Sequence, residues 1–454
     1  MRFTVAVRLL VLLAAISSAA AQTATDEDYH VYTDSPRLLL TQQRLRLLQR
    51  ERQRQSTRWQ QVDALVSGGA ALPEPGFSWA LYYQVARDQA VGRKAVQWAL
   101  STNADPQRDL RQLALVFDWC VPMMSTGQVD QLAAKLERGL AGPAPLAGDV
   151  QRYSARALAA IALADRLPDH GEAMLRSLIR EWWRVGVVQP LEQGQPVIPR
   201  EQMYALYEML HAIRDNLKID LRESAPAYFK TLPVDHVSAH YPSPYQGPDN
   251  DYRIPVYVRE GEPDLAEAAI SRAAELAMVA FDNNALESQY VQGWLMQDRF
   301  LMRSGLGSIY EFLWANPYQP GLSYFQIPLV FHDSGTGHLF ARTSWDEDAT
   351  WIGYFDGHLQ LFQDGHVQSL RPGAATKPVH VGGAVVLSAT DKNAARFRAD
   401  AEAVFVLNLA PRTSYDVEID DQELEEAETD TGGTLVLSLP EGTDSMARIR
   451  RRKD

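Results

Sequence analysis

The spacing of apolar residues changes along the chain and divides it into two regions near Leu322. In the first region apolar positions recur three and four residues apart between prolines, which is the pattern of consecutive helices. The first segment, Ser35–Arg52, has Thr41 as a candidate N-cap ahead of a leucine stripe. The same pattern predicts further helices over Phe77–Leu100, Gln107–Cys120, Gly127–Leu140, Asp149–Leu167, Glu172–Val185, Glu201–Leu217, Asp264–Phe281, Ser288–Arg303 and Ser308–Trp314.

Roughly ten helices joined by short loops favour a helical solenoid or a closed ring of helix pairs. The closed ring is favoured because strands, rather than another helix pair, come next along the chain. Residues 153–167 read YSARALAAIALADRL and are apolar on nearly all sides, which predicts a helix buried between others. We therefore expect an (α/α) helical toroid domain over residues 35–318.

Beyond the helical region apolar and polar residues alternate, which predicts β-strands. The first part of this second region reads as four short strands. Residues 322–454 are long enough for a separate domain, which we expect to be an antiparallel β-sandwich. The expected fold class is therefore multidomain α+β. Two Asp-Gly pairs suit type I′ hairpin turns, in which both central residues need a positive φ: Asp356-Gly357 and Asp364-Gly365.

A two-residue turn at Asp356-Gly357 would place alternate residues of its two strands on opposite faces. One face reads as hydrophobic core. The other face is aromatic and suits either a sugar ring or packing beneath the helices, with its histidine at the interface. The residues of this second face are Trp351, Phe355, His358, Gln360 and Phe362.

A long segment between two predicted helices, residues 234–255, is rich in Pro, His and Tyr. Long loops are uncommon in compact domains unless they are functional or disordered. Aromatic faces, imidazoles and amides are the groups that a sugar site needs, whereas the prolines equally suit a packed surface loop. The candidate residues of this segment are His240, Tyr241, Asn250, Tyr252 and Arg253.

Three further candidates share one face of a predicted helix because they lie three and four residues apart. This face would line the interior of the toroid, either as packing or in contact with a substrate. The residues are Tyr204, Tyr207 and His211.

The net charge and the N-terminal sequence limit which partners and which cellular compartment are expected. The formal net charge is −13, which argues against nucleic acid as the main partner. Residues 1–21 have two arginines, an apolar run and then small residues, which predicts a signal peptide and a secreted or periplasmic protein. The apolar run is too short to span a bilayer, so no transmembrane span is expected in the mature protein. Cys120 is the only cysteine, which excludes an intramolecular disulfide.

No metal and no other cofactor is expected from the motifs. The sequence contains neither HExxH nor a cysteine cluster, and we expect no second histidine at metal-ligand spacing on a helix. A P-loop, a convincing GxGxxG and a GxSxG elbow are also missing from the sequence.

Two segments resemble a known family. RTSWDEDATWIGYFDG (Arg342–Gly357) resembles the start of the β-domain in the heparinase II/III-like superfamily of secreted polysaccharide lyases, and SPRLLLT (Ser35–Thr41) is similar to the motif that opens their helical domain. The resemblance implies a helical toroid followed by a β-sandwich, and β-elimination at a uronic acid of an acidic polysaccharide or oligosaccharide. Family members usually carry a His-x-His-x-Asp-x-Gly-x-Phe stretch after this segment, where the present chain reads FDGHLQLFQDGHVQSL.

Such an elimination needs a group that neutralises the uronate, a base for the ring proton and an acid for the leaving oxygen. In the family the toroid supplies Asn, His and Tyr, and the β-domain supplies a further His. The residue types crowded within residues 234–255 then suggest His240 as the base and Tyr252 as a proton-transfer group beside the cation Arg253. Asn250 and Arg253 would hold the carboxylate, and His358 would act from across the cleft. Further substrate contacts are expected from Tyr241, Tyr204, Tyr207, His211, Trp351, Gln360 and His366.

Two other functions suit the same residues. The first is an exported carbohydrate-binding or envelope protein that does not catalyse a reaction. The second is a toroid glycoside hydrolase, which needs two carboxyl groups about 5–10 Å apart. Carboxylates available for that role in the long segment are Asp235, Asp249 and Asp251.

Overall fold

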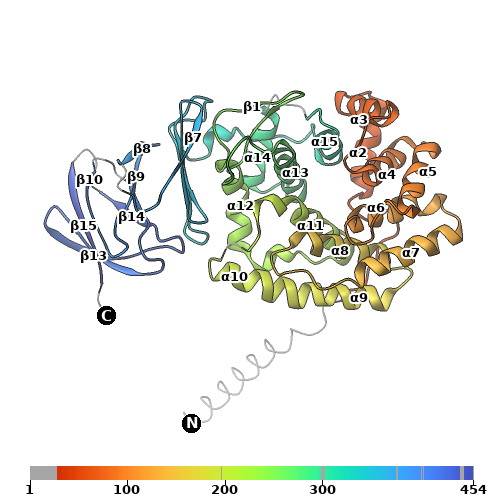
Figure 1. Ribbon diagram of the computed structural model, residues 1–454, viewed down its shortest axis with the longest axis horizontal. Coiled ribbons are helices and arrows are strands. Elements are labelled where there is room, and N and C mark those ends of the chain that lie inside the picture. Colours follow the sequence, from red (N-terminus) through yellow and green to blue (C-terminus); the bar gives the residue numbers. More distant parts are fainter. Residues whose placement is uncertain are drawn as a thin grey trace, which may run out of the picture.

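The computed structural model describes residues 28–452, except for 196, 298–301, 375–376, 400, 402 and 440–443. The expected signal peptide, residues 1–21, lies outside the described residues. A helical part is followed by a β part, as expected for the multidomain α+β class (Figure 1). No helix within the described ranges is both long and apolar enough to cross a membrane.

Most predicted helices are found with small shifts of their ends, but the predicted helix Phe77–Leu100 is divided into α4 and α5, and α3 and α12 were not predicted. Thr41 is an N-cap, because its hydroxyl accepts a hydrogen bond from the backbone N–H of Arg44 at 3.3 Å. The helices are α2 (Gln42–Gln53), α3 (Thr57–Ser67), α4 (Pro75–Ala86), α5 (Gln89–Leu100), α6 (Leu110–Cys120), α7 (Thr126–Leu140), α8 (Val150–Ala162), α9 (Pro168–Ser177), α10 (Gln189–Glu192), α11 (Met203–Leu217), α12 (Pro226–Ser238), α13 (Leu265–Phe281), α14 (Leu286–Gln297) and α15 (Gly307–Trp314).

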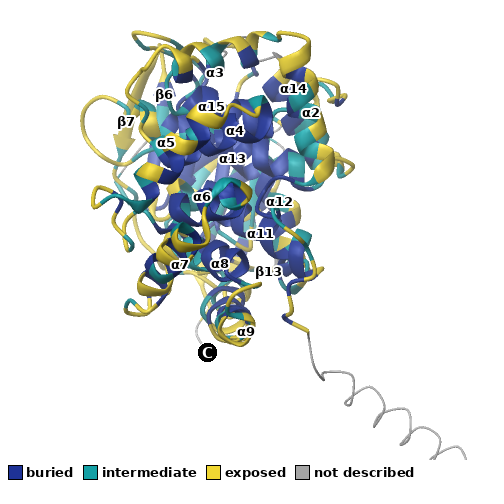
Figure 2. Ribbon diagram, turned by 90° about the vertical axis from the view of Figure 1, so that its right-hand side faces the viewer, coloured by how far each residue is buried: buried dark blue, intermediate teal, exposed yellow. Residues whose placement is uncertain are grey.

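A series of buried helices forms the centre of the helical part. In the order α4, α6, α8, α11, α13 and α15, each helix packs against the next, and α3 contacts both α15 and α4. Figure 2 shows α4, α6, α13 and α15 mostly buried, whereas α7 and α9 carry exposed faces. The second half of α8 is buried on all sides, as its alanine-rich sequence predicts.

A buried ionic network fills the space between these helices. Arg111 on α6 contacts Glu208 on α11 at 2.6 Å and Glu74, which precedes α4, at 2.9 Å. The hydroxyls of Tyr204 and Tyr310 donate to Glu208 and Glu74 respectively. Because every charge in this network has a partner, the cost of its burial is offset. The interior of the helical part is therefore packed rather than open.

The β part has three sheets. Their strand orders are β3-β4-β5-β6-β7, β14-β11-β9-β8 and β10-β15-β12-β13, and a two-stranded hairpin, β1-β2, lies within the helical part. The strands are β1 (Tyr245–Gln246), β2 (Asp251–Tyr252), β3 (Val330–Asp333), β4 (His338–Arg342), β5 (Trp351–Phe355), β6 (His358–Gln363), β7 (His366–Leu370), β8 (Val379–Val381), β9 (Ala384–Ser388), β10 (Ala394–Ala399), β11 (Ala403–Leu407), β12 (Ser414–Ile419), β13 (Gln422–Glu428), β14 (Leu435–Ser438) and β15 (Ser445–Arg451).

The expectation of purely antiparallel pairing is wrong at one place. β9 and β11 pair in parallel, with Ala403 opposite Ala384. Parallel neighbours need a crossover connection, and here the connection runs through β10 in the adjacent sheet. Every other strand pair of the described residues is antiparallel.

The five-stranded sheet has a hydrophobic core on each face. Leu339 and Ile352 pack toward the second sheet, where they meet Val386 and Phe405. The aromatic face joins the core of the helical part, and its members are Phe340, Trp351, Phe355 and Phe362. A further core lies between the second and third sheets. Figure 1 shows this sheet, which includes β7, between the helices and the remaining strands.

The predicted hairpin register is confirmed. Phe355 lies opposite His358, and Trp351 lies opposite Phe362. Asp356 and Gly357 have φ angles of 48° and 77°, which is the left-handed pair that a type I′ turn requires.

Candidate functional site

The aromatic face of the five-stranded sheet packs against the end of α12 and the segment that follows it. Trp351 Nε1 donates to the carbonyl oxygen of Ser238 at 3.0 Å. The hydroxyl of Tyr241 donates to Gln360 Oε1 at 2.7 Å, and Gln360 Nε2 donates to the carbonyl oxygen of Tyr257 at 2.8 Å. Three predicted substrate contacts, Tyr241, Trp351 and Gln360, thus have their polar atoms engaged within the contact between the two parts.

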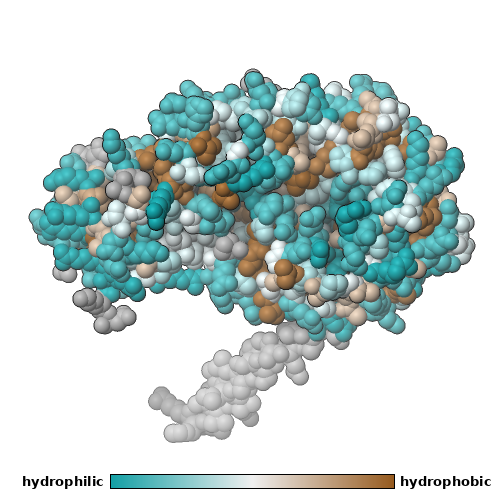
Figure 3. Space-filling model, viewed as in Figure 1, coloured by the Kyte–Doolittle hydropathy of each residue, from teal (hydrophilic) through white to brown (hydrophobic). Residues whose placement is uncertain are grey.

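A cavity of about 650 Å³ lies beside this contact, which is a size suited to a small ligand. Its walls come from α12, from the turn before α11, from β3, β4 and the β5–β6 turn, and from the segment leading to α13. On the mostly hydrophilic face shown in Figure 3, hydrophobic residues appear where the two parts meet. The polar and aromatic residues that line the cavity include Arg200, Glu201, Tyr228, Asp235, Tyr257, Arg259, Glu267, Asp333, His338 and Asp356.

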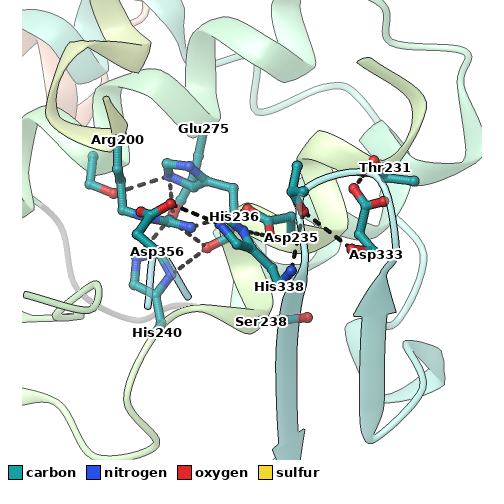
Figure 4. A network of polar contacts seen from close by, with 12 residues as sticks. Arg200, Thr231, Asp235, His236, Ser238, His240, Glu275, Asp333, His338 and Asp356 are labelled. Carbon is teal, nitrogen blue, oxygen red and sulfur yellow. Dashed lines mark hydrogen bonds and ion pairs between the residues drawn. The ribbon is translucent and has the colours of Figure 1, made fainter. Parts of the chain in front are cut away.

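His338, at the start of β4, lies between two carboxylates in the cavity wall (Figure 4). Its Nδ1 is 2.9 Å from Asp235 Oδ1 on α12, and its Nε2 is 3.5 Å from Asp356 Oδ1 in the β5–β6 turn. Arg200 contacts the second oxygen of Asp235 at 3.3 Å. Burial lowers the pKa of His338, but Asp235 and Asp356 outweigh burial and raise it to about 10. The imidazole is therefore a cation at neutral pH.

Two carboxyl groups of the cavity have pKa values displaced in opposite directions. The hydrogen bond from His338 holds the pKa of Asp356 below its ordinary value. Burial, followed by repulsion from Glu201 and Asp264, raises the pKa of Glu267 on α13. One group thus stays ionised while the other retains its proton to higher pH. Such a pair is suited to acid–base chemistry.

Two tyrosines add flat surfaces and hydroxyl groups to the cavity. Burial raises the pKa of Tyr228, so its phenol remains neutral. The hydroxyls of Tyr228 and Tyr257 can donate to and accept from sugar hydroxyls. Arg259, on the same side as Tyr257, lies 3.8 Å from Asp264.

Four of the five loop candidates lie together, but around a different and much smaller cavity. His240, Asn250, Tyr252 and Arg253 line a space of about 10 Å³. That volume is roughly what one water molecule needs, so it has no room for a sugar ring. His240 is 1% exposed, and burial and then Arg200 lower its pKa to about 3. The predicted base is therefore neutral and closed off from solvent.

The expected activation of Tyr252 is wrong in direction. Burial and the neighbouring Asp249 raise the pKa of Tyr252, and its hydroxyl donates to Asp249 at 3.1 Å. Arg253, predicted to lower that pKa, lies over the ring of Trp294 at 4.8 Å and donates to the carbonyl oxygen of Pro242. Asn250 Nδ2 donates to a neighbouring backbone carbonyl at 2.6 Å.

The two Asp-Gly-His histidines do not share a site. His358 begins β6 opposite Phe355, whereas His366 begins β7 opposite Gln363 at the other end of β6, and both are exposed. The two ends of β6 are five residues apart, which is roughly 16 Å at about 3.3 Å per residue. The fold therefore does not bring the two histidines together.

The predicted helix face with Tyr204, Tyr207 and His211 lines the interior of the helical part as packing. All three side chains are buried. His211 Nε2 is 3.0 Å from the carbonyl oxygen of Ala277, and Trp314 Nε1 donates to the hydroxyl of Tyr204 at 3.1 Å. Tyr204 and His211 are thus engaged in packing contacts, whereas Tyr207 lines a separate cavity of about 280 Å³.

A histidine pair at ligand spacing was overlooked in the sequence. His236 and His240 lie four residues apart at the end of α12, and both face Glu275 on α13 (Figure 4). The three side chains are buried and form a possible metal-binding group. The statement that no second histidine has such spacing is therefore wrong.

The cavity residues His338, Asp356, Arg200 and Glu267 were not predicted. Asp356 was interpreted only as a turn residue, whereas Asp235 was predicted only as one of three carboxylates for the glycoside hydrolase alternative. Contacts separated by 103 residues, such as Asp235 with His338, leave no local signal in a single sequence. One local signal for the cavity residues is present in the sequence. Charged residues stand at the ends of the strands of a hairpin whose other residues include several aromatic ones.

Comparisons with known proteins add little to this geometry. No family model matches the chain, and no curated protein matches it. A solved structure described as a glycoside hydrolase matches with a TM-score of 0.33 and 10% sequence identity, covering 84% of this chain and 71% of that chain. At that TM-score the likeness supports no inference, so function has to be inferred from the cavity itself.

Proposed function

We propose that the cavity between the helical part and the five-stranded sheet binds an oligosaccharide and that its carboxyl groups hydrolyse a glycosidic bond. Its volume of about 650 Å³ lies within the range of small-molecule sites. Tyr228 and Tyr257 offer ring faces, and the carboxylates and Arg200 offer partners for hydroxyl groups. These are the groups that sugar binding requires.

The observation that carries the proposal is the opposite displacement of two pKa values in one cavity. Glu267, whose pKa is raised by burial, would protonate the leaving oxygen. Asp356 stays ionised and would stabilise the positive charge that develops at the anomeric carbon or accept a proton from water. His338 fixes Asp356 in this state by hydrogen bonding.

Hydrolysis is favoured over β-elimination because each cation of the cavity already contacts a carboxylate of the chain itself. Elimination at a uronate needs a cation for the carboxylate of the sugar. Arg200 faces Asp235, Arg259 faces Asp264, and His338 lies between two carboxylates. With five carboxyl groups and three cations in its lining, the cavity suits a neutral or amine-bearing sugar better than a uronate.

The proposal also includes three expectations from the sequence: a closed helical toroid, a β-sandwich and export of the protein. The succession α4, α6, α8, α11, α13 and α15, joined back through α3, supports a closed (α/α) toroid. The stacked sheets support a sandwich-like β domain. Export directed by residues 1–21 would bring the protein to polysaccharides outside the cytoplasm.

A panel of substrates distinguishes hydrolysis, β-elimination and carbohydrate binding without catalysis. The mature protein is incubated with neutral, amine-bearing and uronate polysaccharides, while reducing ends and the ultraviolet absorbance of a new double bond are followed. Release of reducing ends without that absorbance is the expected result. Absorbance on a uronate polymer would establish elimination instead, and binding without either signal would indicate a carbohydrate-binding protein.

Variants then test the assignment of Glu267. Glu267→Gln keeps the shape of the side chain but removes its proton, so we expect the rate of hydrolysis to fall by about 10²–10⁴-fold. Glu260→Gln is the matched control, because Glu260 is exposed and lies outside the cavity lining. Equal activity of Glu267→Gln and the control would overturn the role of Glu267.

A further inference from the structure

Three potential ligand atoms converge in the core of the helical part. His236 lies in the last turn of α12, His240 follows just beyond it, and Glu275 lies on α13. Glu275 Oε1 is 3.5 Å from His236 Nε2 and 3.2 Å from His240 Nε2, and the side chains are at most 2% exposed. The three ligand atoms lie within 4.8 Å of one another.

Hydrogen bonding around His240 determines which of its ring nitrogens carries the proton. Nδ1 lies 2.9 Å from the carbonyl oxygen of His236, which can only accept, so Nδ1 is the protonated nitrogen. A neutral imidazole then directs the lone pair of Nε2 at a carboxylate oxygen of Glu275 only 3.2 Å away. Two acceptors at this distance repel each other unless a positively charged species lies between them.

The spacing of these atoms matches a metal site better than a shared proton. Zinc bonds of about 2.0–2.1 Å in tetrahedral geometry place neighbouring ligand atoms roughly 3.3–3.4 Å apart. The two separations around Glu275 Oε1, 3.2 and 3.5 Å, lie on either side of that value. A ring N–H that donates to a backbone carbonyl is also the usual second contact of a metal-bound histidine.

We propose that His236, His240 and Glu275 bind a divalent transition-metal ion, with Zn²⁺ the best match for two imidazoles and one carboxylate. Ser271 Oγ, 3.0 Å from His236 Nε2, is a hydrogen-bond partner of that ring beside the three ligand atoms. Because the site is closed to solvent, its role is structural. The ion ties the end of α12 to α13 and thereby fixes Asp235, the neighbour of His236, in the cavity wall.

Positive side chains near the site limit its affinity. Arg253 and Arg272 line the small cavity next to Glu275. The positive charges of Arg272 and of a third arginine, Arg342, are partly compensated. Arg272 Nε lies 3.9 Å from Glu311, and Arg342 donates to the carbonyl oxygens of Ser238 and His240. We therefore expect weaker binding than at a site of cysteine thiolates, whose ligands bring more negative charge.

Metal content and thermal unfolding of the full mature chain test the proposal. Protein treated with a chelator is titrated with ZnCl₂, and we expect one Zn²⁺ per chain and a rise in Tm. Glu275→Gln, which conserves shape, should weaken Zn²⁺ binding at least tenfold. His240→Ala should do the same. His170→Ala, at an exposed position on α9, is the control and should bind Zn²⁺ as the wild type does.

A spectroscopic measurement keeps the proposal testable if a buried variant does not fold. Wild-type protein loaded with Co²⁺ should show the intense visible bands of a tetrahedral ion with nitrogen and oxygen ligands. Failure of the wild type to retain Zn²⁺ at micromolar concentrations, or binding by Glu275→Gln as tight as by the wild type, would overturn it. Either result would leave a proton between His240 and Glu275 as the explanation.

Discussion

His338 on the five-stranded sheet donates a hydrogen bond of 2.9 Å to Asp235 on α12, and so joins the β part to the helical part within the cavity wall. Asp356 contacts the opposite side of the same imidazole. One protonated ring therefore aligns two carboxylates that the chain supplies from separate regions.

The pKa of His338 predicts how stability depends on pH. Its folded pKa of about 10 is above the ordinary value of 6.5, so its contribution is complete below about pH 6.5 and is lost as pH rises through 10. His338→Gln should therefore lower Tm near neutral pH, and the difference from the wild type should shrink above pH 10. His366→Gln, at an exposed position, is the control. A Tm difference that does not vary between pH 7 and 11 would contradict the charged state of His338.

The Tyr241–Gln360 hydrogen bond should stabilise the contact between the two parts. Tyr241→Phe leaves Gln360 Oε1 buried without its donor, which should lower the free energy of unfolding by about 1–3 kcal/mol. Tyr318→Phe, at a tyrosine that is 51% exposed, should change it little. Urea unfolding measures both. A stable Tyr241→Phe protein with impaired sugar binding would instead favour the substrate contact predicted from the sequence.

Gly293 on α14 should tolerate no side chain. A Cβ there would lie 1.6 Å from the carbonyl oxygen of Leu322, in the segment that leads into the β part. Gly293→Ala must displace that backbone, and we expect a loss of about 1–3 kcal/mol. Gly127→Ala, in the first turn of α7 with no atom within 4 Å, should be neutral or gain up to about 1 kcal/mol. Urea unfolding of the two variants should thus shift in different directions or by clearly different amounts.

Periodicity predicted most of the helices and strands because burial of one face imposes it directly on the sequence. Asp356-Gly357 likewise determined the hairpin register, since few other residues adopt its turn. Helix α12 (Pro226–Ser238) was not predicted, and its last residues, Asp235 and His236 among them, were assigned to a long loop. The helix contains Pro233, a residue that normally interrupts a helical pattern.

The periodicity of apolar residues could not predict the cavity. Its carboxylates and cations come from segments more than a hundred residues apart, and their pKa values depend on burial that only the folded chain creates. Grouping residue types by sequence proximity did bring His240, Asn250 and Tyr252 together correctly, but around a space that holds about one water molecule.

Alternate residues of β4 belong to different cores: Leu339 packs toward the second sheet, and Phe340 packs into the helical part. The two parts that the sequence pattern divides near Leu322 should therefore unfold together rather than separately. The five-stranded sheet cannot leave either neighbour without exposing a row of large apolar side chains to water. Helical circular dichroism and tryptophan fluorescence should accordingly report one shared unfolding transition, and a chain ending before Val330 should expose an aromatic-binding surface prone to aggregation.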